Sequence, residues 1–415
     1  MREDANTIIK NSIDAVLPDK AVRKVLSKRY FQKPVYIIAI GKAAWDMANE
    51  AVKSLNGELF GGVVVTKYQH SKGLIEGMEI IESGHPTPDE NSVRAAKIIM
   101  EKANSLPENM DILLLLSGGG SALVELPANG LNLKDIQDIT DLLLKSGASI
   151  QEINLIRKRL SQFKAGRMAK AFEPRNICAI ILSDVIGNNP DMIASGISYA
   201  DRSKEEEVYE VIHKYGITLE DKYLQCFKEP SVKEINNVEN IIIGSVEELC
   251  KVASENAENL GYNSYVLTTA LECEAVMAGK WFASLAKKIQ QNSDDVQNYI
   301  KPCALIAGGE TIVKVTGNGM GGRNQEIALS AAIDIKGLDN VLLFSLGSDG
   351  TDGPTDAAGG IVEGNTVEIL YDKGIDAKAY LLNNDAYHAL EKANGLIITG
   401  PTGTNVNDVT VLLCK

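Results

Sequence analysis

Short apolar runs alternate along the chain with longer segments whose apolar residues recur at helical spacing. The first run, Val35–Ile40, ends at Gly41 and precedes a helical pattern from about Ala43 to Leu55. This alternation is typical of a parallel α/β sheet, and runs that are apolar throughout predict strands covered by helices on both faces. In this half of the chain the pattern predicts strands at 35–40, 62–66, 78–82, 112–116 and 177–182, and helices near 43–55, 91–100, 136–145 and 149–160.

A polar stretch from Asp201 to Asn240 separates this series from a second one. The run at 241–243 is predicted to begin the second series, followed by a helix that Ser245 caps. A Gly-Gly-Glu turn between the runs 304–307 and 311–315 predicts a hairpin, and hence a mixed sheet. Two α/β domains are therefore expected, over residues 1–237 and 238–415. Further strands of the second domain are predicted at 264–268, 303–307, 341–345, 396–398 and 409–413.

Composition limits the classes of partner. The 415 residues include 42 Lys and Arg against 55 Asp and Glu, a net charge of −13. This charge repels polyanions, so neither nucleic acid nor an anionic membrane is expected as a partner, although a local cationic cluster can still bind a small anion. We see no signal peptide, no apolar run of membrane-spanning length and no CxxC pair among six cysteines. The chain is expected to be a cytoplasmic monomer or homodimer.

Glycine-rich turns after predicted strands are the first candidates for chemistry. The run 113–116 leads into Ser117-Gly118-Gly119-Gly120-Ser121. Glycines allow a ligand to approach the backbone closely, and N–H groups at a helix start attract anions. The segment is therefore either an anion-binding loop or a tight turn without a ligand. It matches neither the GxxxxGK[ST] phosphate loop nor the GxGxxG dinucleotide fingerprint.

Two cations occupy similar places in the pattern. Lys42 follows Gly41 at the start of a predicted helix, where the helix dipole disfavours a cation unless an anion is nearby. Arg323 opens another predicted helix after Gly321-Gly322, and its planar fork suits a phosphate or a carboxylate. A solvated surface lysine is the alternative interpretation for Lys42.

Carboxylates and amides gather in other turns. Mg²⁺ in kinases is held by one or two carboxylates together with phosphate oxygens. Each carboxylate is equally explained as an ordinary turn residue. The carboxylates at predicted strand ends or turns are Asp184, Glu310, Asp349 and Asp352, and the segment 400–408 adds Asn405 and Asn407. This set, with few histidines, favours phosphoryl transfer, which needs positioning and charge neutralisation more than a nucleophilic side chain.

Several of these strings together resemble one known family, the glycerate 2-kinases that carry a MOFRL domain. The similarity runs in order from about residue 37 to the end of the chain. The strings that carry it are Ile40-Gly-Lys-Ala-Ala44, Ser117-Gly-Gly-Gly-Ser121, Ser183-Asp184, Gly309-Glu-Thr311, Gly321-Gly-Arg-Asn-Gln-Glu326, Asp349-Gly-Thr-Asp-Gly-Pro-Thr-Asp356 and Gly400-Pro-Thr-Gly-Thr-Asn-Val-Asn-Asp408.

The resemblance implies phosphorylation of D-glycerate at its 2-hydroxyl with ATP and Mg²⁺, giving 2-phosphoglycerate and ADP. It also implies a Rossmann-like N-terminal domain, a smaller α/β MOFRL domain and an active site in the cleft between them. Lys42 and Arg323 correspond to the family's catalytic lysine and arginine. We further expect residues 117–121, Asn405 and Asn407 to bind the nucleotide, Glu310, Asp349 and Asp352 to contact substrate, and Asp184 and Asp349 to hold the metal.

The sequence departs from the family pattern in three places. Asn188-Asn189 replace an Asp pair, Ile197-Ser198 follow Ala194-Ser-Gly196 where relatives have Pro-Thr, and Arg159 stands where many have His. Two other classes of function stay open at this point. They are an NAD(P)H-dependent hydroxypyruvate reductase, which the absent dinucleotide fingerprint disfavours, and a metabolite-binding protein without catalysis.

Overall fold

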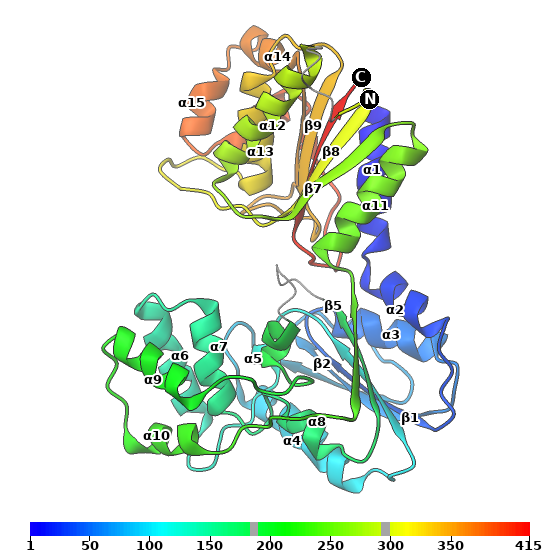
Figure 1. The fold of residues 1–415 in the computed structure, drawn as a ribbon, viewed down its shortest axis with the longest axis vertical. Coiled ribbons are helices and arrows are strands. Elements are labelled where there is room, and N and C mark those ends of the chain that lie inside the picture. Colours follow the sequence, from blue (N-terminus) through cyan, green and yellow to red (C-terminus); the bar gives the residue numbers. More distant parts are fainter. Residues whose placement is uncertain (183–189, 292–298) are drawn as a thin grey trace. The chain divides into compact units, whose positions relative to one another are not determined.

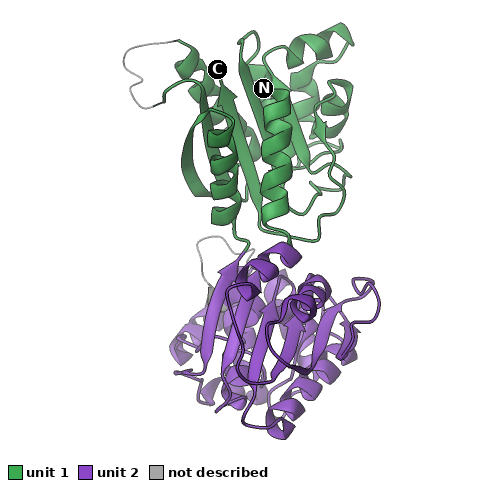
Figure 2. Cartoon of the chain, turned by 90° about the vertical axis from the view of Figure 1, so that its right-hand side faces the viewer, with its two compact units in different colours: residues 1–17, 244–415 green, residues 18–243 purple. Residues whose placement is uncertain are grey.

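The computed structural model describes residues 1–182, 190–291 and 299–415. Their contacts divide the chain into two compact units (Figures 1 and 2). Unit 1, green in Figure 2, comprises residues 1–17 and 244–415, and unit 2, purple, comprises residues 18–243. In the described part of the chain, no helix has both the length and the apolar character needed to cross a bilayer.

Unit 2 is built on a six-stranded, all-parallel sheet with the strand order β3-β2-β1-β4-β5-β6. This is the order of Rossmann folds, so the predicted fold class is confirmed for this unit. The strands are β1 (Val35–Ile40), β2 (Leu59–Lys67), β3 (Met78–Ser83), β4 (Asp111–Leu116), β5 (Ile177–Leu182) and β6 (Val238–Ile243).

Helices cover both faces of this sheet (Figure 1). Ile38 and Ile40 pack into a core with α4 and α8 on one face, while the alternate residues of β1 face the side that α3 covers. The helices are α2 (Pro18–Leu26), α3 (Ala44–Ser54), α4 (Glu90–Ser105), α5 (Gly120–Leu123), α6 (Leu133–Lys145), α7 (Ile150–Arg159), α8 (Arg167–Ala171), the 3₁₀ turn η1 (Pro190–Ser195), α9 (Glu205–Lys214) and α10 (Asp221–Lys228).

Unit 1 contains a six-stranded mixed sheet with the order β11-β10-β9-β12-β8-β7. Only the β7–β8 pair is parallel in this sheet. The strands are β7 (Asn263–Leu271), β8 (Cys303–Gly309), β9 (Val341–Gly347), β10 (Gly359–Glu363), β11 (Leu396–Ile397) and β12 (Asp408–Cys414). The predicted mixed sheet is thus confirmed.

Two layers of helices cover the sheet of unit 1 (Figure 1). Helices α12 and α13 pack on one face, and α11, with α1 against it, packs on the other. Ser245 caps α11 by accepting a hydrogen bond from the Glu248 N–H at 3.3 Å, as the sequence predicted. The helices are α1 (Arg2–Ala15), α11 (Val246–Asn259), α12 (Ala275–Gln290), α13 (Arg323–Asp334), α14 (Thr366–Asp372), α15 (Ala377–Leu382) and α16 (Ala386–Lys392).

The hairpin predicted at residues 304–315 is wrong. Strand β8 ends at Gly309, and beyond it Ile312 makes only an isolated bridge with Glu274. The place beside β8 is taken by β12, which pairs with it from Cys303 to Gly309. The short turn indicated a local partner, but β12, with seven buried residues, provides a longer ladder.

The compact units also divide the chain differently from the predicted domains 1–237 and 238–415. The run at 241–243, expected to begin the second domain, is the end of β6 and pairs in parallel with β5. Residues 2–15 form α1, whose apolar face packs on α11 of unit 1. An amphipathic pattern shows that a helix has a face to bury, but it does not identify the element that covers it.

Candidate active site

In unit 2 the strand order reverses between β1 and β4, and two predicted site segments follow these strands. Gly41 and Lys42 follow β1, and Ser117 follows β4. The Ala43 N–H donates to Ser117 Oγ at 3.1 Å, and the Lys42 N–H donates to the Gly118 carbonyl at 2.9 Å. Ligands of open α/β sheets bind outside the carboxyl ends of strands at such a reversal. The fold thus brings Lys42 and the glycine-rich loop together at this place.

The loop after β4 lies very close to its neighbours. Gly119 has a φ of 87°, and a Cβ atom there would lie 3.0 Å from His85 Cδ2 and 3.2 Å from Lys42 Cγ. Within the described ranges, the N–H groups of Gly118 and Gly119 have no hydrogen-bond acceptor. Both residues are partly exposed. The loop therefore presents two N–H donors beside a lysine.

The charge at this loop is positive. Burial, with repulsion from Lys42, Lys67 and His70, lowers the pKa of His85 to about 4, so its ring is neutral at physiological pH. Lys42 has an exposed side chain, and in the described part of the chain no carboxylate pairs with it. Within the described ranges, a lysine without a carboxylate partner thus lies beside two N–H donors, and this arrangement favours binding of an anion.

A second cluster forms in unit 1 around Arg323, the first residue of α13. Its Nε and Nη2 donate to Asp408 at 2.6 and 3.0 Å, and its Nη1 donates to Glu310 at 2.6 Å. Burial opposes the charge, but these carboxylates raise the pKa of Arg323. A guanidinium has five N–H donors, and these three bonds leave two of them for a ligand. The side chain is 32% exposed, so a ligand can reach them.

Two buried carboxyl groups support this arginine and its helix. Burial raises the pKa of Asp408 to about 6, although the bonds from Arg323 oppose this shift. Asp352 accepts hydrogen bonds from the N–H groups of Asn324 and Gln325 at 3.1 and 2.9 Å. Asp352 therefore caps the start of α13, and the remaining shift of its pKa is upward because it is buried.

Asp349 is more accessible than the buried Asp408 and Asp352. It is partly exposed, and its Oδ1 accepts a hydrogen bond from the Thr351 N–H at 3.0 Å. A Cβ atom on Gly347 would lie 3.3 Å from Asp349 Oδ1 and 3.4 Å from Asp408 Oδ1, so the two carboxylates flank the end of β9. Nearby, Asn405 is exposed and Asn407 is buried, with the Asn407 carbonyl accepting from the Ser348 N–H.

Known proteins resemble this chain over nearly its whole length. The MOFRL family model matches residues 303–408, and a domain of unknown function (DUF4147) matches residues 4–228. The chain is 49% identical to D-glycerate 2-kinase of Thermotoga maritima over 411 residues, 99% of this chain and 98% of that protein. The chain belongs to the MOFRL-domain glycerate kinase family. This is a family of phosphotransferases that act on an alcohol group.

Other relatives of the family agree in sequence and in fold. Glycerate 2-kinase of Pyrococcus horikoshii is 43% identical over 390 residues, covering 91% of this chain and 87% of its own. The crystal structure of Thermotoga maritima glycerate kinase superposes with a TM-score of 0.95, covering 100% of this chain and 99% of that one. A relative from Agrobacterium vitis, 34% identical over 91% of this chain and 86% of its own, is named a putative hydroxypyruvate reductase.

The structure distributes the predicted glycerate kinase residues between the units. Unit 2 holds Lys42 with residues 117–121, and unit 1 holds Glu310, Arg323, Asp349, Asp352, Asn405 and Asn407. The predicted nucleotide-binding residues are therefore divided, because 117–121 and the two asparagines lie in different units. Asp184, predicted to hold the metal, lies outside the described residues.

The donor groups present decide whether a metal ion can bind here. Among residues 1–182, 190–291 and 299–415, no three His, Cys, Asp or Glu side chains converge as a metal cage. Mg²⁺ in phosphoryl-transfer enzymes needs only one or two protein carboxylates, because phosphate oxygens complete its shell. The partly exposed carboxylate of Asp349 fits that requirement.

Sequence reasoning missed several residues of these clusters. His85 lies beside the glycine loop, and Asp408 holds Arg323. Arg157 and Lys164 lie buried behind the loop, where they donate to the carbonyls of Ser121 and Val124. The signals for the first two were weak: His85 follows a predicted strand, and Asp408 precedes one. A buried ion-pair partner far away in sequence leaves no local pattern.

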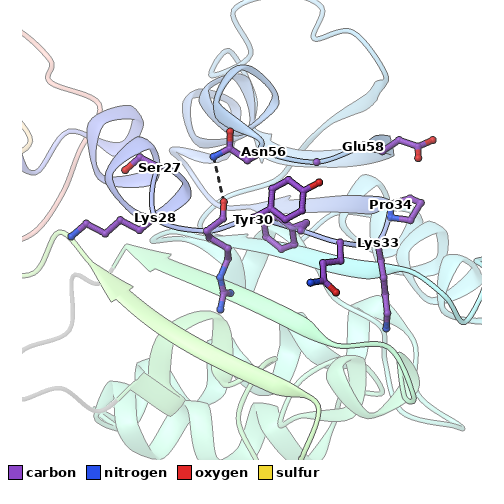
Figure 3. Close-up of a pocket in the computed structure, with 11 residues that line it drawn as sticks. Ser27, Lys28, Tyr30, Lys33, Pro34, Asn56 and Glu58 are labelled. Atoms are coloured by element: carbon purple, nitrogen blue, oxygen red, sulfur yellow. Dashed lines mark hydrogen bonds between the residues drawn. The ribbon is translucent and has the colours of Figure 1, made fainter.

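A pocket of about 650 Å³ elsewhere in unit 2 is not part of this site (Figure 3). It is lined by residues 27–34 and 56–58, at the amino ends of β1 and β2, whereas Gly41 follows the carboxyl end of β1. Arg29 lines this pocket, and its guanidinium already donates to Cys178 Sγ at 2.6 Å and pairs with Glu239. The pocket contains none of the predicted site residues.

Proposed function

We propose that the chain, in the presence of Mg²⁺, transfers the γ-phosphoryl group of ATP to the 2-hydroxyl of D-glycerate, giving 2-phosphoglycerate and ADP. The observation that carries this proposal is Lys42 beside the N–H groups of Gly118 and Gly119, where the Rossmann sheet reverses its strand order. Among the described residues, Lys42 has no carboxylate partner and the two N–H groups have no acceptor. The names of the Thermotoga and Pyrococcus relatives support the choice of substrate.

The loop of unit 2 is proposed to bind the phosphates of ATP. Glycines at 118–120 let phosphate oxygens approach the backbone, and Lys42 neutralises charge that develops on the transferring group. The His85 ring lies beside the loop but carries no charge near neutral pH, because its pKa is lowered to about 4. Asn405 and Asn407 are proposed to form hydrogen bonds with the nucleotide.

The cluster of unit 1 is proposed to bind the substrate glycerate. The two remaining N–H donors of Arg323 suit the glycerate carboxylate or a phosphoryl oxygen, and Glu310 and Asp349 accept hydrogen bonds from hydroxyl groups. Asp352 is proposed to act through α13, because its carboxylate is already bonded to two backbone N–H groups. When bound, Mg²⁺ neutralises phosphate charge, and Asp349 and Asp184 are the proposed ligands.

The reaction needs no covalent intermediate. The 2-hydroxyl oxygen bonds to the γ-phosphorus while the bond from that phosphorus to the β–γ bridging oxygen breaks. The hydroxyl proton leaves to a carboxylate or to water, and the partly exposed Asp349 is the carboxylate we propose for this step. The protein's contribution is positioning and charge neutralisation. We propose that this chemistry takes place in the cytoplasm, with ATP and D-glycerate as the only partners required.

The test mixes protein with D-glycerate, ATP, Mg²⁺ and enolase, without phosphoglycerate mutase. Phosphoenolpyruvate is expected, because enolase accepts 2-phosphoglycerate only. If phosphoenolpyruvate forms only after the mutase is added, the product is the 3-phosphate and the proposed position of transfer is wrong. Absence of any phosphorylated product would refute the kinase assignment for this chain.

A hydroxypyruvate reductase is the second candidate, because the sheet has the order of dinucleotide-binding folds and a relative bears that name. The first turn after a strand, Gly41-Lys42-Ala43, nevertheless lacks the glycine spacing that lets a pyrophosphate rest on the backbone. NADH oxidation in proportion to hydroxypyruvate added, with no phosphorylation of glycerate, would favour the reductase.

A further inference from the structure

A buried arginine of α7 holds the last residue of the glycine loop. The side chain of Arg157 is 9% exposed, and its Nη2 donates to the Ser121 carbonyl at 2.7 Å. In the described part of the chain its Nε has no acceptor. Burying a guanidinium is costly unless its bonds return the free energy. Among the described residues, the Ser121 carbonyl is the one neutral hydrogen-bond acceptor of this arginine, so the loop is held directly by its guanidinium.

The same helix holds Ser121 by its side chain as well. Ser121 Oγ lies 2.9 Å from Ser195 Oγ, and the Ser195 hydroxyl donates to Asn154 Oδ1 at 3.0 Å. Asn154 and Arg157 are three residues apart, so they lie on one face of α7. One helical face therefore fixes both the backbone and the side chain of Ser121.

Charges behind the loop add an electrostatic effect. Lys164, fully buried, donates to the Val124 carbonyl at 3.2 Å and pairs with Glu125. Arg157 lies 3.9 Å from the same carboxylate. In the part of the chain that the structure describes, two cations thus share one anion in an interior where charges are weakly screened, which leaves a positive excess behind the loop. Such an excess favours an anion on the loop's open side.

We propose that Arg157 is a positioning residue for the phosphate-binding loop: it fixes Ser121 and supplies buried positive charge, without touching the nucleotide. This inference rests on the proposed function, because it takes the loop as the phosphate site. Loss of Arg157 should weaken phosphate binding more than it harms the fold.

A second buried arginine of unit 2 gives a matched control. Arg175 is 4% exposed and donates to the carbonyls of Pro107 and Ala103, both at 3.0 Å. Those carbonyls lie at and just beyond the end of α4. R175Q and R157Q therefore remove the same group from similar burial, but only R157Q removes a bond to the loop.

The experiment titrates sodium tripolyphosphate into the full-length wild type, R157Q, R157K and R175Q by calorimetry, and measures KM for ATP in the same proteins. R157Q is expected to weaken tripolyphosphate binding and raise KM roughly tenfold or more, because a hydrogen bond from a charged group is lost. R157K, which keeps the charge, should recover part of the loss. R175Q should lower the melting temperature without changing either constant.

Equal binding by R157Q and wild type, or an equal loss in R175Q, would overturn the positioning role. If R157Q does not fold, R157K and N154A replace it in the titration. R157K weakens the bond to the Ser121 carbonyl, and N154A weakens the hold on the Ser121 side chain through Ser195. The tripolyphosphate titration measures phosphate binding without any reaction, so its outcome does not depend on phosphorylation of glycerate. If wild type binds tripolyphosphate and R157Q binds it more weakly, but wild type does not phosphorylate glycerate, only the proposed reaction is refuted.

Discussion

Lys42 in unit 2 and Arg323 in unit 1 both follow a glycine, the first after β1 and the second at the start of α13, but their surroundings differ. Lys42 has no carboxylate partner among the described residues and lies beside two open N–H groups. Arg323 is bonded to Asp408 and Glu310, with Asp349 and Asp352 in the same cluster. The first arrangement favours an anion. In the second, Asp408 and Glu310 hold the guanidinium, and the remaining carboxylate of Asp349 fits a hydroxyl group or one ligand position of a divalent cation.

The largest effect is expected from Lys42→Ala. Removing one group that stabilises the transferring charge should lower kcat for glycerate phosphorylation about 10²- to 10³-fold. The fold should persist, because the side chain is exposed. Initial rates measure this effect, and Lys97→Ala, the same change on an exposed position of α4, is the control. Turnover within twofold of wild type would remove Lys42 from the mechanism.

Asp408→Ala should destabilise unit 1 by about 3 kcal/mol, because it leaves Arg323 without its buried partner. Glu310→Ala, which removes the more exposed partner of the same arginine, should cost less than about 1 kcal/mol. Urea unfolding of both variants measures the difference. Equal losses would show that burial does not distinguish the two carboxylates.

Within the same cluster, Asp352→Ala should lower the free energy of unfolding by about 1–2 kcal/mol, because α13 loses its cap. Asp349→Ala should change stability by less than about 0.5 kcal/mol while lowering activity. Chemical unfolding and the coupled assay, applied to both variants, separate a structural from a functional carboxylate. A stable, inactive Asp352→Ala variant would reverse this assignment.

The smallest effect is a pH dependence in unit 2. Burial lowers the pKa of Lys164 to about 8, with Glu125 opposing the shift and Arg157 adding to it. Below that pH the ammonium is charged and supports phosphate binding; above it the support is lost. KM for ATP in the wild type should therefore rise roughly two- to tenfold between about pH 7.5 and about pH 9. In Lys164→Arg, whose guanidinium stays charged, KM should stay flat, and a matching rise there would contradict this cause.

The sequence was sufficient for features that are local. Strand β1 was predicted at its observed bounds, and Lys42 and residues 117–121 were placed at strand ends that the Rossmann order then joined. Periodicity and glycine position depend on neighbouring residues, so one segment is enough to show them. The resemblance of whole motifs identified the family.

Features that depend on distant partners were not predictable. The turn at 308–310 suggested a hairpin, but β12, about 100 residues later, fills that place. Asp352 stays a predicted substrate contact, but its hydrogen bonds to the start of α13 were not predicted, because that helix begins 29 residues earlier in the chain. The Lys164–Glu125 pair joins two residues whose burial no local pattern reveals.

The most direct test of this account is a calorimetric titration of a non-hydrolysable ATP analogue, and separately of D-glycerate, into wild type, Lys42→Ala and Arg323→Lys. The account predicts that Lys42→Ala weakens binding of the analogue by roughly tenfold or more and leaves glycerate binding unchanged. Arg323→Lys should do the reverse. If both variants lost the same ligand, or if Lys42→Ala lost only glycerate, the division of labour between the two clusters would be contradicted.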